Sequence, residues 1–591
     1  MAILSTLPHQ LATAASQDLV PWAKDIIQPD HSLTNLSLLR QAIQTAVSLR
    51  LTLPPPSRGW FNLWSNSSNQ SMTEWARTLC NIWSSDITAS SASKLAALIG
   101  LWEGLCLEQQ DARLRREVEV EVLVAIELGF QKLKTGMKAL GKRKASDRLP
   151  PVVILAASVL PQIDLTSIAA LETNDILTTI IDLFPSSLDV EDPLEYLDLV
   201  TLIRIVISTF ELSLSEKSSV NTRQIVRLSE RLQEYALSIS PESLVDSTTA
   251  INQKYQEGLT SLILPIHESL LDLIASSSLP SLASFTLSKN MLMTFQTSAS
   301  LIDKLGGVST HVGLGNVWWG LIDMACGPLW SMEQRTSMIR SLREGVRKGE
   351  IGEVSRINYL LLVVEQFVGV DVFKDEILRE LILPNVYPYL EDDTSKDVFE
   401  SSHSVMLAIF SGRLRFPRSS DHDDLNAISS GSEELILKYC DCLIRNALAK
   451  RLSTEQVQHA FTILFNRASS ESSRVVEVCL YKIVNSFPDI PTDRASLSED
   501  DQMLPLVYLS LLPTIPFPLL TKFLAQAEDI IFSRTLPQTS RREEMVEVVW
   551  NGISDGLGDE GKEIGVAWWL EMRERLKREA RRARPEFGAK L

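Results

Sequence analysis

The chain has 591 residues, about four times the usual length of one domain, so the sequence predicts several domains or one extended array. Its formal net charge of -17 argues against a general role in binding nucleic acid. Hydrophobic residues make up 45% of the chain and charged residues 22%, as in a folded globular protein, and the six scattered cysteines are too few for a disulfide framework.

At the N-terminus no basic residue precedes the apolar stretch, so we expect no secretory signal. No uninterrupted apolar run reaches the roughly 18 residues that a membrane-spanning helix needs. The best candidate, Val152 to Pro161, is much shorter. We therefore expect any membrane association to be peripheral or to depend on protein partners.

Helical periodicity dominates, and strand alternation is scarce. Asp192-Pro193-Leu194-Glu195 predicts a helix start, because Asp192 can cap, Pro193 suits the first turn and Glu195 completes a capping box. Three stripes at three- and four-residue steps predict buried helix faces. They are Leu194, Leu197, Val200, Ile203, Ile207 and Phe210; Ile357, Leu360, Leu361, Val364, Phe367 and Val368; and Ile436, Tyr439, Cys440, Leu443 and Ala447.

Polar, proline-rich or charged stretches predict three loops, at 54–70, 141–151 and 418–432. The predicted organisation is an N-terminal helical segment (1–145), a central α-solenoid (146–417), a flexible acidic and serine-rich loop (418–432), a C-terminal helical segment (433–584) and an exposed tail (585–591).

Many helices joined by short turns favour an all-α fold with few or no strands, an irregular α-solenoid of stacked antiparallel helix pairs. The tetratricopeptide signature is absent, so we expect a HEAT- or armadillo-like array. A solenoid also suits the length, because one helical bundle would struggle to give 591 residues a single core.

Two glycine-rich stretches resemble phosphate-binding loops. Gly556 to Glu563 has the glycine and lysine spacing, but Glu563 stands where Ser or Thr would hold magnesium, and Asp559 and Glu560 would repel phosphate. Gly306 to Gly315 also lacks a preceding strand. Polar turns between helices are the favoured interpretation of both stretches.

Other clusters are also weak indications of a site. Cys440 and Cys442 lie two residues apart on a helical stripe and point to different sides, so we expect buried thiols rather than zinc ligands. Residues 421–424 could bind a cation weakly, but the pattern favours a solvated acidic loop. Lys142-Arg143-Lys144 resembles a nuclear-import or phosphate-contacting cluster, which the acidic chain and the position in a predicted loop disfavour. We predict no catalytic residues, no metal site and no cofactor.

The closing tripeptide Ala589-Lys590-Leu591 has the small, basic and leucine pattern of the C-terminal peroxisomal import signal. A receptor would capture the carboxylate with donors, the Lys590 ammonium with polar or acidic groups, and the Leu591 side chain in an apolar hole. Pro585 ends the preceding helix and Gly588 loosens the chain, so we expect an exposed tail. A chance match is the alternative.

Leu383-Pro-Asn-Val-Tyr-Pro-Tyr-Leu390, an acidic turn and then Phe399 to Phe410 resemble the central region of the fungal intraperoxisomal peroxin, peroxin eight. The chain length, the helix-rich pattern and the tail agree with this resemblance. His403 shares a helical stripe with Phe399, Met406 and Phe410, which favours a hydrogen-bonded core histidine over a ligand.

The resemblance implies a non-enzymatic peroxisome biogenesis factor, a peripheral scaffold on the matrix side of the membrane. It would bind the tetratricopeptide-type import receptor through its tail, bridge the docking complex to the RING complex, and assist cargo release. Family members often carry a second, N-terminal-type signal. Here Leu4, Gln10 and Leu11 have its spacing without the leading cation, while Arg451-Leu452 with Gln458 has the cation but is followed by His459.

Two alternatives stay open at this point. One is a cytosolic or nuclear transport-type helical scaffold whose last tripeptide is accidental. The other is a peroxisomal matrix enzyme of unfamiliar helical fold, which predicts a deep pocket lined by His311, His403 or paired acids.

Overall fold

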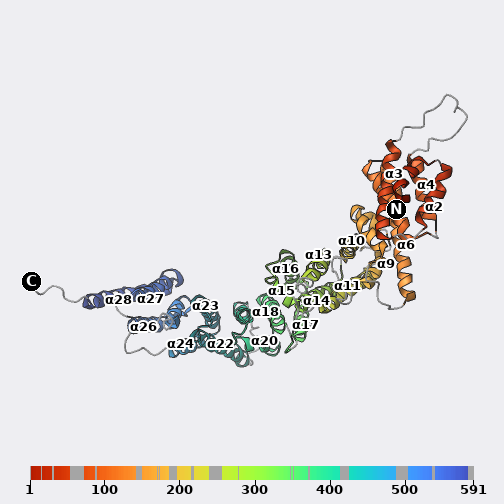
Figure 1. Ribbon diagram of the computed structural model, residues 1–591. Helices are drawn as coiled ribbons and strands as arrows, with labels where there is room; N and C mark the ends of the chain where they lie inside the picture. The colour runs from red at the N-terminus through yellow and green to blue at the C-terminus, as the bar shows by residue number, and fades with distance from the viewer. Residues whose placement is uncertain are drawn as a thin grey trace, which may run out of the picture. The chain divides into compact units, whose positions relative to one another are not determined.

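The computed structural model describes residues 2–14, 16–28, 32–52, 72–86, 89–140, 149–169, 171, 173–184, 196–213, 218–238, 256–276, 279–346, 348–350, 352–370, 373–412, 425–487, 503–535 and 539–583. All of the regular elements in these ranges are helices (Figure 1). They form two compact units, Met1–Ala325 with Arg347–Gly352, and Cys326–Val346 with Glu353–Leu591. The predicted all-α fold is confirmed.

The first unit is built from helices α1 to α16. Their bounds are α1 Ala2–Thr13, α2 Ser16–Ile27, α3 Leu33–Thr52, α4 Met72–Ser85, α5 Ser91–Leu107, α6 Ala112–Leu140, α7 Pro151–Val159, η1 Leu160–Gln162, α8 Leu165–Ala169, α9 Thr173–Leu183, α10 Leu197–Ser213, α11 Ser218–Ser238, η4 Gly258–Ile263, α13 Leu264–Ala275, α14 Ser281–Thr297, α15 Ala299–Lys304 and α16 Val312–Cys326.

Alternate helices of the first unit form two layers. In one layer α3, α5, α7, α10 and α13 pack in succession, and in the other α4, α6, α9, α11 and α14 do so. Gly100 on α5 lies so close to the Arg40 carbonyl of α3 that a side chain there would collide with backbone. The Arg40 guanidinium also donates to Glu103 on α5 and to Ser158 on α7, over 2.8 and 2.7 Å. These contacts fix three successive helices of one layer.

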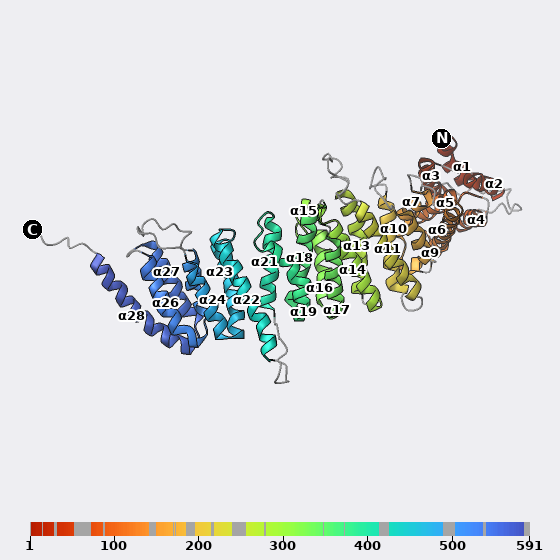
Figure 2. The same ribbon diagram turned by 90° about the horizontal axis from the view of Figure 1, so that it is seen from below.

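The second unit repeats the same layered arrangement. Its elements are α17 Met332–Gly345, α18 Glu353–Val370, α19 Asp375–Ile377, η5 Leu378–Ile382, α20 Leu383–Val386, η6 Tyr387–Tyr389, α21 Lys396–Ser411, α22 Leu425–Leu448, α23 Thr454–Glu471, α24 Ser473–Asn485, α25 Met503–Ser510, η9 Leu512–Thr514, α26 Phe517–Arg534, α27 Ser540–Asn551, η10 Gly552–Gly556 and α28 Asp559–Ala583. One layer runs α18, α21, α23, α25 and α27, and the other α22, α24, α26 and α28 (Figure 2).

Prolines accompany five of the turns that depart from α geometry in the described ranges, η1, η4, η5, η6 and η9. The π-helical turns η4 and η5 are each followed directly by Leu-Pro, at Pro265 and Pro384. Proline lacks an N–H and its ring displaces the carbonyl four residues earlier, which a widened turn accommodates. Each of the 3-10 turns η1, η6 and η9 has a proline as its second residue.

Two of the three predicted stripes are buried throughout. All six residues from Ile357 to Val368 line the core side of α18, and all five from Ile436 to Ala447 line that of α22. In the first stripe, however, Leu197 is 43% exposed, whereas Val200, Ile203 and Ile207 are buried. Leu197 is the first residue of α10 and extends past the packed surface. The predicted helix start at 192–195 lies outside the described residues.

Most residues of the three predicted loops lie outside the described residues. The ranges that the structure does not describe there are 53–71, 141–148 and 413–424. Helix α22 already begins at Leu425, so the latter part of the predicted loop at 418–432 is helical. The two compact units meet in sequence at residues 326–352, which is not a predicted boundary. The five-segment division stays a prediction.

One stretch of the described chain, Gly258–Ala275, is long and apolar enough to cross a membrane. In the structure 61% of that stretch is buried inside the first unit, as for the core helix of a globular protein.

Candidate functional site

A charged groove lies in the second unit between α17 and the segment α19–η5. Ser331 and Gln334 form a capping box that starts α17, as the pattern of a Ser followed three residues later by Gln predicts. Met338, Ile339 and Leu342 face the core, which leaves Arg340 and Arg343 on the opposite, exposed side of the helix.

The other wall of the groove comes from Lys374 to Leu381. Leu378 and Ile382 anchor this wall in the core, while Glu376 and Glu380 are exposed. The π turn of η5 precedes Pro384 and adds a residue to the turn, which changes the directions in which the side chains before it point. The proline is therefore part of what shapes the groove.

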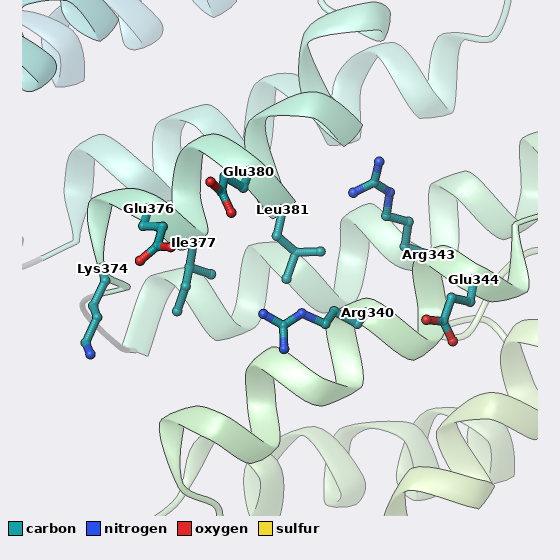
Figure 3. Close-up of a pocket in the computed structure, with 8 residues that line it drawn as sticks. All are labelled: Arg340, Arg343, Glu344, Lys374, Glu376, Ile377, Glu380 and Leu381. Atoms are coloured by element: carbon teal, nitrogen blue, oxygen red, sulfur yellow. The ribbon is translucent and has the colours of Figure 1, made fainter.

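Eight residues line this groove, which has a volume of about 640 Å³. They are Arg340, Arg343, Glu344, Lys374, Glu376, Ile377, Glu380 and Leu381. Figure 3 shows the Arg340 side chain extending from α17 toward Ile377, and Leu381 pointing into the space between the walls. The acidic Glu376 and Glu380 lie on the wall opposite α17 (Figure 3).

The lining combines an aliphatic floor with three cations and three carboxylates. No two of these six charged groups form an ion pair with each other within the described ranges. Charges that are exposed and not paired across a groove are free to meet a ligand. With Ile377 and Leu381 between them, they suit a peptide segment that offers one apolar side chain and charges of both signs.

Elsewhere in the second unit, one backbone carbonyl accepts hydrogen bonds from three side chains. The Leu390 oxygen follows η6 and accepts from Asn446 Nδ2 at 2.7 Å, from His403 Nε2 at 3.1 Å and from Cys442 Sγ at 3.7 Å. His403 Nδ1 lies 2.9 Å from the Tyr439 hydroxyl. This cluster, the Leu390 node, joins the acidic turn to α21 and α22.

His403 in this node is neutral near pH 7. Burial lowers the pKa of His403 to about 4, although the hydrogen bond to the Leu390 carbonyl opposes that shift. The Nε2–H donates to Leu390, so Nδ1 accepts from the Tyr439 O–H, which fixes the tautomer. The predicted role of His403 as a hydrogen-bonded core histidine is confirmed.

The predicted targeting residues cannot be placed at the groove. Ala589, Lys590 and Leu591 lie outside the described residues, so the exposed tail stays a prediction. Leu4, Gln10 and Leu11 belong to helix α1, where Leu11 is buried and its carbonyl accepts from Trp75 Nε1 at 3.2 Å. A receptor could bind the Leu11 side chain only after α1 detached from α3 and α4. The second signal also stays a prediction.

The remaining sequence candidates are structural in the described chain. Cys440 and Cys442 are buried thiols, as predicted, and burial raises the pKa of Cys442 to about 12. The predicted turns account for only part of each stretch: residues 557–558 link η10 to α28 while residues 559–563 begin α28, and residues 306–311 form a turn while residues 312–315 begin α16. His311 lies in the second of these turns, and neither it nor His403 lines the groove. Residues 142–144 and 421–424 lie outside the described residues.

Sequence reasoning missed the groove and Asn446. Arg340 and Arg343 are three residues apart on the solvent side of a helix, a detectable signal, but Lys374 and Glu380 join them only through tertiary packing. The sequence did contain one signal for Asn446. The proline-containing turn before Leu390 leaves the Leu390 carbonyl without a backbone donor, so a side chain has to donate a hydrogen bond to it.

Residues 336–411 match a family model described as the PEX8 central TPR-like domain. The match includes the groove and the Leu390 and His403 part of the Leu390 node. No curated protein matches the chain. A solved structure titled "Kap95:Nup1 complex" is similar over 98% of this chain and 82% of that chain, at 10% identity and a TM-score of 0.22, which is too low to carry an argument.

Proposed function

Because the chain belongs to the PEX8 peroxins by its central domain, we propose that it is a non-enzymatic assembly factor for protein import into peroxisomes. Membership of this family implies a peroxisomal protein. The proposal adds a location on the matrix side of the membrane, in peripheral contact with it. There the protein binds the import receptor and bridges the docking complex to the RING complex.

The match at 336–411 is the observation that carries this proposal, since the same residues build the charged groove. Stacked helix pairs offer long side-by-side surfaces, which suits a protein that binds several partners at separate places. The groove is lined by aliphatic and charged side chains, a combination suited to recognition of a peptide segment.

The tail supplies the contact with the receptor. Ala589-Lys590-Leu591 presents a leucine side chain, an ammonium and a carboxylate, the groups by which import receptors recognise cargo tails. A tail of this kind competes with cargo for the same receptor site, so its binding assists cargo release. A second contact through the groove raises the effective concentration of the tail at an assembled complex.

The test is a pull-down with the purified tetratricopeptide-type receptor and purified docking-complex peroxins. Deleting residues 589–591 should weaken receptor binding at least about tenfold, because the carboxylate and the leucine contact are lost together. Arg340→Glu should leave receptor binding intact and weaken docking-complex binding several-fold, because it reverses the charge at the groove.

Arg573→Glu is the matched control, since Arg573 is an exposed arginine on α28 outside the groove. It should bind both partners like the unaltered chain. Receptor binding that persists without residues 589–591 would show that the tail is not the contact. Equal effects of Arg340→Glu and Arg573→Glu would remove the groove from the proposal.

A further inference from the structure

Helix α6 has apolar side chains on two opposite sides. One side packs against α4, α5 and α9 and buries Leu114, Val118, Val122, Ile126 and Phe130. On the solvent side, Val120, Val124 and Leu128 are 56%, 42% and 49% exposed. A helix at the surface of a globular unit is normally polar on its outer side, so this second apolar stripe requires an explanation.

These three residues form one continuous ridge. Residues four apart are neighbours on a helix surface, and the eight residues from Val120 to Leu128 span about 12 Å. The sequence alternates valine and glutamate from Val118 to Val122, so both sides of α6 receive valines. Val118 and Val122 pack into the core of the first unit, whereas no other described part of the chain covers Val120 and Val124.

A cation stands at each end of the ridge. Arg116 lies one turn before Val120 and Lys132 one turn after Leu128, about 24 Å apart along the axis, and both are exposed. Neither forms an ion pair in the described part of the chain. Burial and the nearby Lys132 lower the pKa of Lys94 on α5, so a second lysine adds positive charge at this end.

The carboxylates beside the ridge are already engaged. Glu117 accepts from Arg77 at 2.6 Å and pairs with Arg113 at 3.3 Å, and Glu127 accepts from Gln131 at 3.2 Å. Glu121 accepts from Ser84 at 2.5 Å. Each of these carboxylates has a donor, whereas Arg116 and Lys132, at the two ends of the ridge, form no ion pair in the described part of the chain.

We propose that this surface, the α6 face made of Arg116, Val120, Val124, Leu128 and Lys132, docks an amphipathic partner helix that carries a carboxylate at each end of its apolar stripe. Apolar side chains of the partner pack along the ridge, and its carboxylates meet the two cations. The face is in the first unit, outside the family-matched residues, and the proposal does not depend on the proposed function.

The charge pattern favours a protein helix over an anionic bilayer. Glu121 and Glu127 have only the uncharged partners Ser84 and Gln131, so their negative charges beside the ridge would repel lipid phosphates. The ridge also has no aromatic residue to lie among the headgroups. A single helix face buries less area than a standard interface, so binding should be weak and reversible.

The test uses the full chain and two labelled synthetic helical peptides of about 18 residues, roughly the length from Arg116 to Lys132. Both peptides carry three leucines spaced four residues apart. One peptide has a glutamate at each end of this leucine stripe, and the other has a lysine at each end. Fluorescence anisotropy should show the glutamate-ended peptide binding at least about tenfold more tightly. Val124→Asp should weaken that binding by about tenfold or more, and the pair Arg116→Glu with Lys132→Glu should reverse the preference between peptides.

Leu282→Asp on α14 is the matched control, because Leu282 is 71% exposed and lies away from α6 in sequence. It should bind like the unaltered chain, and circular dichroism should show every variant folded. Equal binding of the two peptides would overturn the proposal. So would binding only after removal of residues 53–71, a concentration-dependent dimer lost in Val124→Asp, or Val124-dependent flotation with phosphatidylserine vesicles, because each assigns the face to another occupant.

Discussion

The Leu390 carbonyl shows how one polar atom can organise a junction between helices. It lies after the proline-containing turn η6, where no helical N–H donates to it. Instead, Asn446 on α22 and His403 on α21 donate hydrogen bonds to this carbonyl. A buried carbonyl without a partner would cost about 1 to 3 kcal/mol. The node therefore holds the acidic turn against the two helices.

His403 makes this junction sensitive to acid. Its pKa is lowered to about 4, from about 6.5 in an unfolded chain, so its contribution to stability is complete above about pH 6.5 and is lost as the pH falls toward 4. We expect the free energy of opening α21 and α22 to fall by about 2 kcal/mol between pH 7 and pH 5. Amide hydrogen exchange at the two pH values measures it.

His403→Gln is the control for this effect, because a glutamine can donate to Leu390 and accept from Tyr439 without titrating. Its exchange in α21 and α22 should change much less with pH. An equal acid response in this variant would exclude His403 as its source.

His267 is a different kind of buried histidine. It is fully buried on α13, its ring lies edge-on to Phe295, and neither ring nitrogen has a hydrogen-bond partner within the described ranges. Burial lowers the pKa of His267 to about 3. An apolar side chain of similar size would remove two unsatisfied polar atoms from the core.

We therefore expect His267→Leu to stabilise the first unit by about 1 to 3 kcal/mol. Calorimetric melting of the full chain should show a higher midpoint for the transition that includes α13. Ser269→Ala is the control, because the Ser269 hydroxyl is already hydrogen-bonded to the Pro265 carbonyl and to Arg204. A lower midpoint in His267→Leu would mean that the imidazole has a partner that stabilises the fold.

At the scale of elements, Arg542 joins three helices at the C-terminal end of the second unit. From α27, Nε and Nη2 donate to the hydroxyl and carbonyl of Thr535 at the end of α26, over 2.9 and 2.8 Å. Nη1 donates to Glu579 on α28 over 2.9 Å. Only 5% of Arg542 is exposed, so the three bonds are shielded from water.

Arg542→Met should cost about 2 to 4 kcal/mol locally, because it leaves the Thr535 carbonyl and Glu579 without their donors. Faster amide exchange in the last turns of α28 is the expected signature. Arg541→Met is the matched control, since Arg541 forms a more exposed i,i+3 pair with Glu544 that should contribute little. Equal exchange in the two variants would show that α28 is held by its apolar side alone.

At the scale of the whole molecule, the prediction concerns where in the cell the protein accumulates. An N-terminally tagged chain should gather in peroxisomes, and the same chain without residues 589–591 should become diffuse, because the receptor reads the last carboxylate and leucine together. Fluorescence microscopy with a peroxisomal marker measures this. Lys590→Arg keeps the cation and is the matched control. Unchanged peroxisomal signal after the deletion would show that another part of the chain directs import.

Periodicity in the sequence was enough to predict the all-α architecture and two complete buried helix faces, because each of these helices buries the stripe that its own spacing creates. The stripes of α18 and α22 needed no tertiary information. The role of His403 followed in the same way from the apolar residues that share its side of α21. The matched family domain is described as TPR-like, although its signature is not readable in the sequence; what stays recognisable is the stacking of helix pairs.

Tertiary structure decided everything that joins separate elements. The groove exists because Pro384 follows a π turn that faces α17, and the Leu390 node exists because Asn446 arrives from α22. Helix α6 is a third example. Its valines occur on two opposite sides of the helix, but the fold buries only one of these sides. Local spacing fixes which side of a helix is apolar, but only packing determines which neighbour covers it.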